Sequence, residues 1–294
     1  MPSDDLLHRF IFDHCDVRGE LVTLSESYRE VLSHNPYPPA VQRLLGECLA
    51  AASLLSSTLK YQGLISIQAR GDGPIMALVA EATHDNTLRG IVRLNPDQPL
   101  SAEQGQTGTL GDLLGKGIMA ITIEPEKGER YQGIVPMGSD QLSECLQHYF
   151  QQSEQLDTRL WLRADKQAAT GLLLQALPTP KNASREANQE SWHTLCTLAD
   201  TVTTEELLTL DHPQLLFRLF HEESPRLFSP HDFRFACSCS HERSANALSS
   251  LGREEVEQLL VEQGTITIDC QFCNQRYRFD AGAVRELFGD STLH

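Results

Sequence analysis

Four of the eight cysteines lie in two close pairs near the end of the sequence, Cys237-Ser-Cys239 and Cys270-Gln-Phe-Cys273. Residues i and i+2 of an extended segment point to the same side, so the first pair can present both sulfurs to one point. A Cys-x-x-Cys turn brings its two sulfurs together in the same way. Two such pairs form a four-thiolate tetrahedron, which is the ligand set typical of Zn²⁺.

Zinc is the ion that this ligand set favours, because thiolates are soft ligands that select it over calcium or magnesium. An iron–sulfur cluster is the alternative, although its cysteines usually follow other spacings. His241 is an alternative ligand close to Cys239. Because four thiolates already complete the tetrahedron, we expect His241 to face solvent just past the site.

The other four cysteines are scattered, and free cysteine is commonly a small buried residue. Cys145 and Cys196 lie in helix-like segments, and Cys15 lies in a polar turn where partial exposure is expected. Cys48 is expected on the buried side of a helix, in a stripe with Val41, Leu44, Leu45, Ala52 and Leu55.

The elements before the paired cysteines mix strands and helices without strict alternation, which predicts an α+β domain over residues 1–180. The hydrophobic pattern predicts helices near 26–33, 38–58 and 139–152. It predicts strands over 8–13, 17–24, 62–69, 75–83, 88–94, 118–124, 131–136, 157–164 and 170–177.

A helical linker is predicted over 181–236, after the break at Leu177-Pro178-Thr179-Pro180. It contains an amphipathic helix over 186–200, a capping box at Thr203–Glu206 and a short helix that starts at Pro213. Isolated helices shorter than about 12–15 residues are marginal in water. We therefore expect their apolar faces to dock on the first domain.

A small C-terminal domain is predicted over 237–294, with helices over 242–250 and 253–263. Strands over 265–268 and 275–279 would form a hairpin around Cys270 and Cys273, and Asp280 would cap a final helix. A structural zinc contributes about 10–16 kcal/mol to the folding of such units, as much as the net stability of a whole domain. Removing the metal should therefore unfold this domain.

The acidic composition limits the possible partners. Lys and Arg number 24 against 40 Asp and Glu, a net charge of −16, which disfavours a general nucleic-acid binder. No apolar run reaches the roughly 18 residues that would span a bilayer. The N-terminus lacks a secretory pattern, so we expect a cytoplasmic protein whose thiols stay reduced.

Two roles for the metal site are compatible with the residues. In the first, zinc only stabilises the chain. In the second, oxidation of the thiolates displaces the ion, because a disulfide cannot donate two thiolates. The second role would unfold the C-terminal domain, release the linker helices and expose apolar surface around Trp192.

The sequence resembles the bacterial redox-regulated 33 kDa heat-shock chaperone family over its whole length. The order Cys-x-Cys then Cys-x-x-Cys is quite specific to that family. The matching stretches are Val17-Arg-Gly-Glu-Leu-Val, Ala51-Ala52-Ser-Leu-Leu, Leu64-Ile-Ser-Ile-Gln-Ala-Arg-Gly-Asp-Gly-Pro74, Leu219-Phe-His-Glu-Glu223, Cys237-Ser-Cys-Ser240 and Cys270-Gln-Phe-Cys-Asn274.

The resemblance implies a holdase chaperone that uses no ATP and is not an enzyme. Its reduced form would hold one zinc per chain on Cys237, Cys239, Cys270 and Cys273 and would be inactive. Oxidants would release zinc and form the disulfides Cys237–Cys239 and Cys270–Cys273. The linker would then unfold, and the protein, usually as a homodimer, would bind unfolding clients, with 1–180 as the client-binding and dimerisation domain.

Two competing hypotheses belong to other classes. A zinc-ribbon nucleic-acid module would use Arg276 and Arg278 around Tyr277, against the unfavourable net charge. A thiol oxidoreductase would use Cys270 and Cys273, although that chemistry usually sits on a thioredoxin-like βαβ unit and a single Cys-x-x-Cys.

Overall fold

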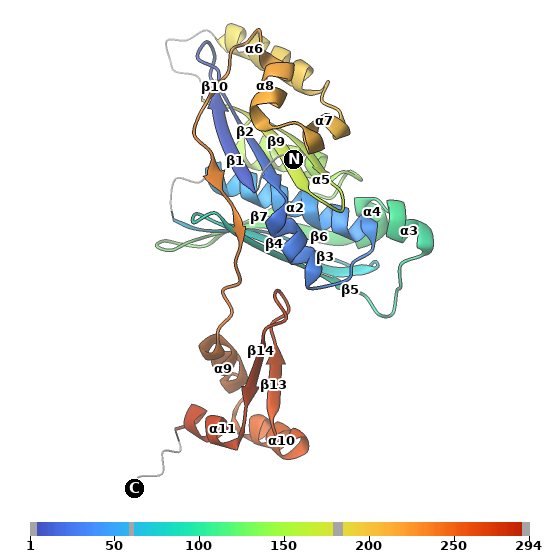
Figure 1. Ribbon diagram of the computed structural model, residues 1–294, viewed down its shortest axis with the longest axis vertical. Coiled ribbons are helices and arrows are strands. Elements are labelled where there is room, and N and C mark those ends of the chain that lie inside the picture. The colour runs from blue at the N-terminus through green and yellow to red at the C-terminus, as the bar shows by residue number, and fades with distance from the viewer. Residues whose placement is uncertain (1–4, 59–61, 179–184, 290–294) are drawn as a thin grey trace. The chain divides into compact units, whose positions relative to one another are not determined.

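The computed structural model describes residues 5–58, 62–178 and 185–289, and the chain divides into two compact units, 1–236 and 237–294 (Figure 1). The first unit contains two six-stranded sheets with one long helix between them. The α+β class predicted from the sequence is confirmed. The break predicted at residues 177–180 is described only as far as Pro178. Residues 179–184, which include the start of the predicted linker, lie outside the described residues.

The first sheet has the strand order β10-β1-β2-β9-β8, and β11 also pairs with β1. Its long strands are antiparallel, with Leu21 opposite both His8 and Leu172. The strands are β1 (Leu6–Ile11), β2 (Val17–Leu24), β8 (Thr158–Ala164), β9 (Ala169–Ala176), β10 (Arg226–Leu227) and β11 (His231–Asp232).

The second sheet has the order β12-β5-β4-β3-β6-β7. It is antiparallel except for β12, which joins its edge in parallel with β5. The strands are β3 (Gly63–Gly71), β4 (Ile75–Thr83), β5 (Thr87–Leu94), β6 (Gly117–Pro125), β7 (Tyr131–Val135) and β12 (Arg234–Phe235).

Helix α2 (Pro39–Thr58) packs against strands of both sheets, so it is buried on nearly every side. The sequence predicted a one-sided apolar stripe that includes Cys48, and the structure buries Cys48 together with Ala50, Ala51 and Leu54. A helix that is apolar all round is typical of such a central position. Helix α1 (Glu26–Ser33) and helix α5 (Leu142–Tyr149), which continues into the π-helical turn η1 (Phe150–Glu154), complete this core.

Two short helices were missed by the sequence analysis, α3 (Ala102–Thr107) and α4 (Leu110–Leu114). Each begins with a capping box, Ser101 with Gln104 and Thr109 with Asp112. These pairs are a recognisable signal for a helix start.

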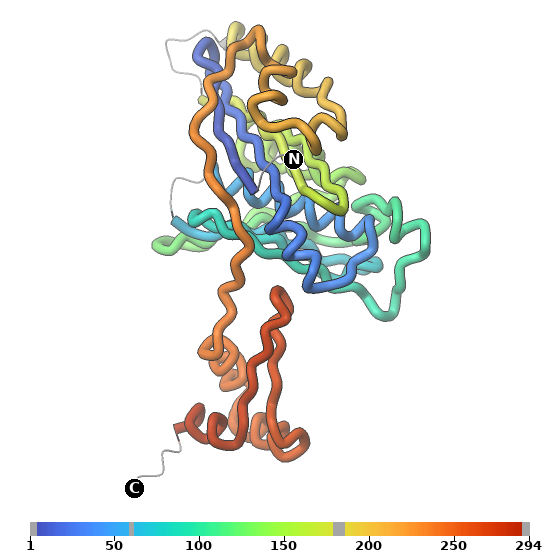
Figure 2. The backbone as a smooth tube through the Cα atoms, in the orientation of Figure 1, coloured from blue at the N-terminus to red at the C-terminus, as the bar shows by residue number. Residues whose placement is uncertain are grey.

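The linker contains α6 (Arg185–Ala199), α7 (Thr204–Thr209) and α8 (His212–Phe220), as its pattern predicted. They lie on the face of the first sheet that is turned away from α2 (Figure 1). The chain then returns as an extended segment along the first unit, where the two-residue strands β10, β11 and β12 join both sheets (Figure 2). These three strands were not predicted.

The second unit contains α9 (His241–Ser249), α10 (Arg253–Gln263), the hairpin β13 (Ile266–Asp269) and β14 (Arg276–Phe279), and α11 (Ala281–Leu287). Asp280 caps α11, as expected, by accepting a hydrogen bond from the backbone N–H of Ala283. Among the described residues, its buried apolar core is small and consists of Leu248, Val256, Ile266, Phe279 and Val284.

Candidate metal centre and the linker interface

The two cysteine pairs come from two different kinds of local structure. Cys237 and Cys239 lie in an extended stretch just after β12. Cys270 and Cys273 lie in the turn of the β13–β14 hairpin, where the N–H of Cys270 bonds the carbonyl of Gln275 at 2.9 Å. Asn274 closes this turn in the left-handed region, with φ of 56°. The hairpin therefore fixes two of the four thiols.

The four sulfur atoms converge on one point. All lie within 4.8 Å of one another, and they form the only group of three or more potential metal ligands within the described ranges. The shortest separations are 3.4 Å, between Cys239 and Cys273, and 3.6 Å, between Cys237 and Cys270. A tetrahedral ion with bonds of about 2.3 Å places its sulfurs about 3.8 Å apart. The cluster is thus able to bind a metal ion.

Tyr277 on β14 adds a contact that the sequence analysis missed. Its hydroxyl donates a hydrogen bond to Cys239 Sγ at 3.1 Å. Burial opposes ionisation of Cys239, but the hydrogen bonds from Tyr277 and from the neighbouring thiols lower its pKa to about 7. Burial raises the pKa of Cys237 and Cys273. Hydrogen bonds to the thiolate therefore single out Cys239 as the most easily ionised of these three.

The remaining predicted residues lie outside the sulfur cluster. His241 is exposed, as expected, but its ring also packs on Phe279 with 4.6 Å between centroids. Arg276 forms a two-fold ion pair with Asp269 across the hairpin, at 2.7 and 3.0 Å. The scattered thiols are separate: Cys48, Cys145 and Cys196 are buried, and Cys15 is partly exposed.

Comparison with known proteins decides the family. The profile of the Hsp33 protein family matches residues 5–280. This chain belongs to the Hsp33 family. A 33 kDa chaperonin of Ectopseudomonas mendocina is 52% identical over 286 residues, covering 97% of this chain and 95% of the relative. One from Pseudomonas paraeruginosa is 53% identical over 290 residues, covering 98% and 96%.

A solved structure supports the fold of this Hsp33 family member. The crystal structure of the 33 kDa chaperonin of Thermotoga maritima matches with a TM-score of 0.82 at 24% sequence identity. The match covers 97% of this chain and 98% of the other. The family is one of chaperones, not enzymes, so the oxidoreductase hypothesis is wrong.

The linker of this Hsp33 family member covers a continuous apolar surface. Side chains from β1, β2, β8 and β9 form one side, including Phe10, Leu21, Trp161 and Leu172. Side chains from the linker helices form the other side: Leu195, Ala199, Leu207, Leu215, Leu216, Leu219 and Phe220. We call this set of residues the linker interface.

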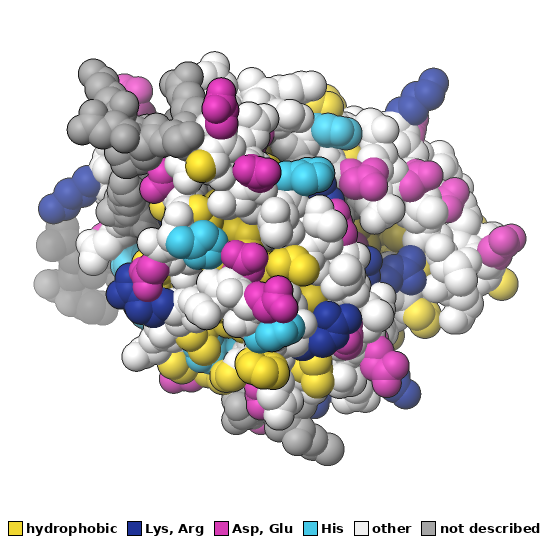
Figure 3. Space-filling view, turned by 90° about the horizontal axis from the view of Figure 1, so that it is seen from above, with side chains coloured by type: hydrophobic (Ala, Val, Ile, Leu, Met, Phe, Trp, Pro, Cys, Tyr) yellow, Lys and Arg dark blue, Asp and Glu magenta, His cyan; other side chains and the backbone are white. Residues whose placement is uncertain are grey.

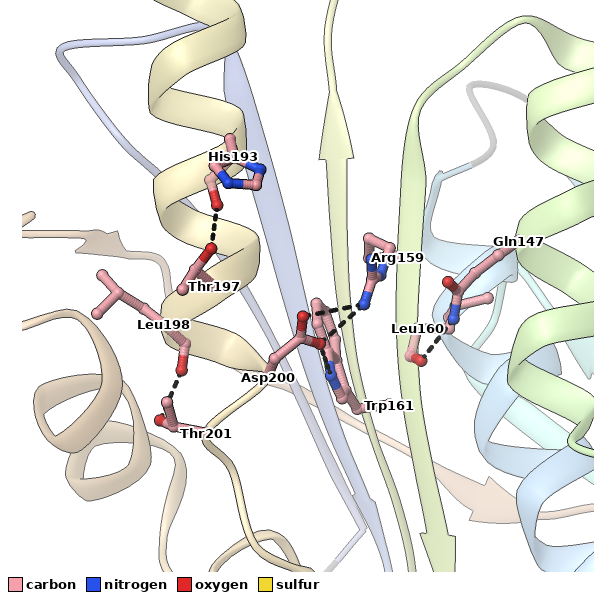
Figure 4. A network of polar contacts seen from close by, with 9 residues as sticks. All are labelled: Gln147, Arg159, Leu160, Trp161, His193, Thr197, Leu198, Asp200 and Thr201. Atoms are coloured by element: carbon pink, nitrogen blue, oxygen red, sulfur yellow. Dashed lines mark hydrogen bonds and ion pairs between the residues drawn. The ribbon is translucent and has the colours of Figure 1, made fainter.

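Polar contacts at the edge of the linker interface fix α6 (Figure 4). The carboxylate of Asp200, just after α6, accepts hydrogen bonds from Arg159 at 2.8 and 3.1 Å and from the indole Nε1 of Trp161 at 3.0 Å. Within α6, the Thr197 hydroxyl bonds the carbonyl of His193 at 2.8 Å. The helix end is therefore tied to β8 through one acidic side chain.

None of the helices in the described residues is long and apolar enough to cross a membrane. Acidic side chains and histidines are spread over the face seen in Figure 3, and the Lys and Arg side chains there are dispersed. This distribution agrees with the net charge of −16. It gives no support to the nucleic-acid hypothesis.

Proposed function

We propose that this Hsp33 family chaperone is an ATP-independent holdase that oxidation switches on. The observation that carries the proposal is the linker interface: a buried apolar surface covered by helices that cannot persist without it. Helices α7 and α8 have only 6 and 9 residues. Helices of this length are marginal alone, so once undocked they unfold and leave the apolar face of β1, β2, β8 and β9 available to unfolding client proteins.

Zinc is the ion proposed for the cluster, one per chain in the reduced form. Cys237, Cys239, Cys270 and Cys273 would hold it, and the four sulfurs fit its tetrahedral preference. The ion would supply folding energy to a unit in which the described residues include a buried apolar cluster of only five side chains. This explains why a small domain can serve as the sensor.

The chemistry of activation is thiol oxidation. In each pair, Cys237 with Cys239 and Cys270 with Cys273, the two thiolates lose two electrons and form one disulfide. For each disulfide, one molecule of hydrogen peroxide takes up these two electrons and two protons from solvent and becomes two molecules of water. The four thiolates are then no longer available as ligands, and residues 237–294 lose the energy that held them folded.

The proposed roles are assigned to three consecutive parts of the chain. Residues 1–180 bind clients and dimerise, 181–236 are the metastable linker, and 237–294 are the redox sensor. In the structure all eight cysteines are thiols and not disulfides. A cytoplasmic location would keep them reduced until an oxidant appears.

The test is light scattering from a client that aggregates on heating, with this protein either thiol-reduced or treated with peroxide. We expect suppression only by the oxidised form, a loss of about one zinc per chain, and two disulfides between sequence neighbours. Equal suppression by both forms would falsify the switch. Mapping that finds Cys237–Cys270 and Cys239–Cys273, the pairs closest in the structure, would overturn the proposed pairing.

A further inference from the structure

Two histidines from distant parts of the chain meet between strand β1 and the linker helix α8. His8 lies on β1 and His212 is the first residue of α8. Their Nδ1 atoms are 2.8 Å apart, and the rings meet edge to face with 4.9 Å between centroids. Both residues are buried, with exposed fractions of 9% and 6%. This contact joins the linker to the first sheet.

The hydrogen bonds of this pair fix its protonation. The other ring nitrogen of His212, Nε2, lies 2.9 Å from the hydroxyl of Thr23 on β2. Both nitrogens of His212 are thus engaged, and a neutral pair needs one proton between the two Nδ1 atoms. A first added proton places a positive charge inside a buried contact. A second places two N–H groups face to face at a distance that suits only one donor.

The charged groups around the pair do not remove this preference for the neutral state. Asp211, at the start of α8, favours a charge on His8, whereas His231 on β11 disfavours it. The Asp211 carboxylate accepts the backbone N–H of Gln214 as the helix cap. His231 Nε2 lies 3.1 Å from an Arg9 nitrogen, which can only donate, so it acts as the acceptor.

We propose that the His8–His212 pair is an acid-sensitive latch that holds α8 on the first sheet and opens below neutral pH without any change at the cysteines. The client-binding consequence of opening rests on the proposed function, but the opening itself does not. The ligand that opens the latch is a proton bound by the histidine pair.

The direction in which pH changes the docking of α8 follows from the buried, neutral state of the pair. Burial and the neighbouring His8 lower the pKa of His212 to about 3, and burial lowers that of His8. An undocked histidine has an ordinary pKa of about 6.5. Docking is therefore at full strength above that value and weakens as the pH falls below it. Each excluded proton shifts the equilibrium about tenfold per pH unit.

The two tryptophans of the chain report this opening directly. Trp161 is one of the buried members of the linker interface, and Trp192 on α6 packs against it. The experiment uses the full chain, thiol-reduced and loaded with zinc, at pH 7.5 and 5.5. The opening constant is taken from urea titrations followed by tryptophan emission, and zinc is counted in the same samples.

For the wild-type chain we expect the opening constant to rise between pH 7.5 and 5.5 by about tenfold for each of the two excluded protons, up to about a hundredfold, while zinc is retained. His212→Gln, which keeps one hydrogen bond but does not titrate, removes one of these protons and should make the change about tenfold smaller. His212→Phe provides a second non-titrating variant if the glutamine disturbs the fold. His221→Gln changes an exposed histidine at the end of the same helix and should behave as wild type.

Several results would overturn the latch: a wild-type opening constant that is independent of pH, a change in both His212 variants as large as in the wild type, or loss of zinc that parallels the opening. Light scattering from a heated client separates this inference from the proposed function. Suppression by peroxide-treated protein at pH 7.5 with no pH-dependent opening defeats the latch alone. Opening at pH 5.5 with no suppression after oxidation defeats the proposed function alone.

Discussion

The carboxylate of Asp200 accepts a 3.0 Å hydrogen bond from the indole nitrogen of Trp161, and through it the end of α6 is held against β8. Arg159 binds the same carboxylate, but that ion pair is half exposed and contributes little by itself. The indole is different, because Trp161 is only 8% exposed and a buried N–H that loses its hydrogen-bond partner is costly.

Asp200→Ala should loosen the linker without touching the sulfur cluster. Loss of the bond to the buried indole and of the exposed ion pair should lower the free energy of linker docking by about 1–2 kcal/mol. Urea titration followed by tryptophan emission measures this change. Glu222→Ala, which alters an acidic side chain that is 86% exposed, is the control. Docking that is equally strong in the Asp200 variant would show that the network of Figure 4 is incidental.

Leu219→Ala should produce a chaperone that is active without oxidant. Leu219 is 3% exposed within the linker interface, and a buried Leu→Ala change costs about 2–5 kcal/mol. Helix α8 has little stability of its own, so this loss should open the linker in reduced, zinc-loaded protein. Aggregation assays under reducing conditions provide the measurement. Phe217→Ala is the matched control, because Phe217 lies on the same helix and is 72% exposed; if both variants activate equally, burial of the interface is not the cause.

Cys270→Ser should abolish stoichiometric zinc binding, and Cys48→Ala should not. Cys270 belongs to the sulfur cluster, whereas Cys48 is buried in α2 among apolar side chains. Chelation of zinc from the wild type should unfold residues 237–289 and leave strands β1–β9 of the two sheets intact. Metal analysis together with amide hydrogen exchange resolves both effects. Retention of metal by the Cys270 variant would remove it from the ligand set.

Glu20→Gln should stabilise the first unit at neutral and alkaline pH. Glu20 on β2 is 1% exposed. One carboxylate oxygen accepts a hydrogen bond from Ser57, and the other has no hydrogen-bond partner among the described residues. Burial raises its pKa to about 7, from an ordinary value near 4.5. Its contribution to stability is therefore complete below pH 4.5 and is lost as the pH rises to 7, by about 3 kcal/mol.

The difference in unfolding free energy between Glu20→Gln and wild type should grow from near zero at pH 4.5 to about 3 kcal/mol at pH 7 and then stay level. Urea unfolding across this range is the measurement. A difference that does not vary with pH would mean that Glu20 titrates normally.

The sequence was most informative where the signal is local. Cysteine spacing, the capping box at Thr203 and the period-two strands each depend on residues within one element, and the structure has them where expected. The sequence did not predict β10–β12, because two-residue strands have no hydrophobic period. They exist only through pairing with other strands, as Leu227 of β10 pairs with Phe10 of β1. The contacts of Tyr277 with Cys239 and of His8 with His212 were equally hidden, since they join residues 38 and 204 positions apart.

The last backbone hydrogen bond of the first unit lies next in sequence to the proposed sensor. The N–H of Ala236 donates to the carbonyl of Leu88 at 3.1 Å, and Cys237 is the next residue. The segment 226–235, which runs back along the first unit, is held by three two-residue strands, each too short to be stable without its neighbours. We therefore expect disorder that starts at Cys237 to detach β12 first, then β11 and β10, in the direction of α8. The loss of a few backbone hydrogen bonds beside one thiol would then decide how much of the chain is released.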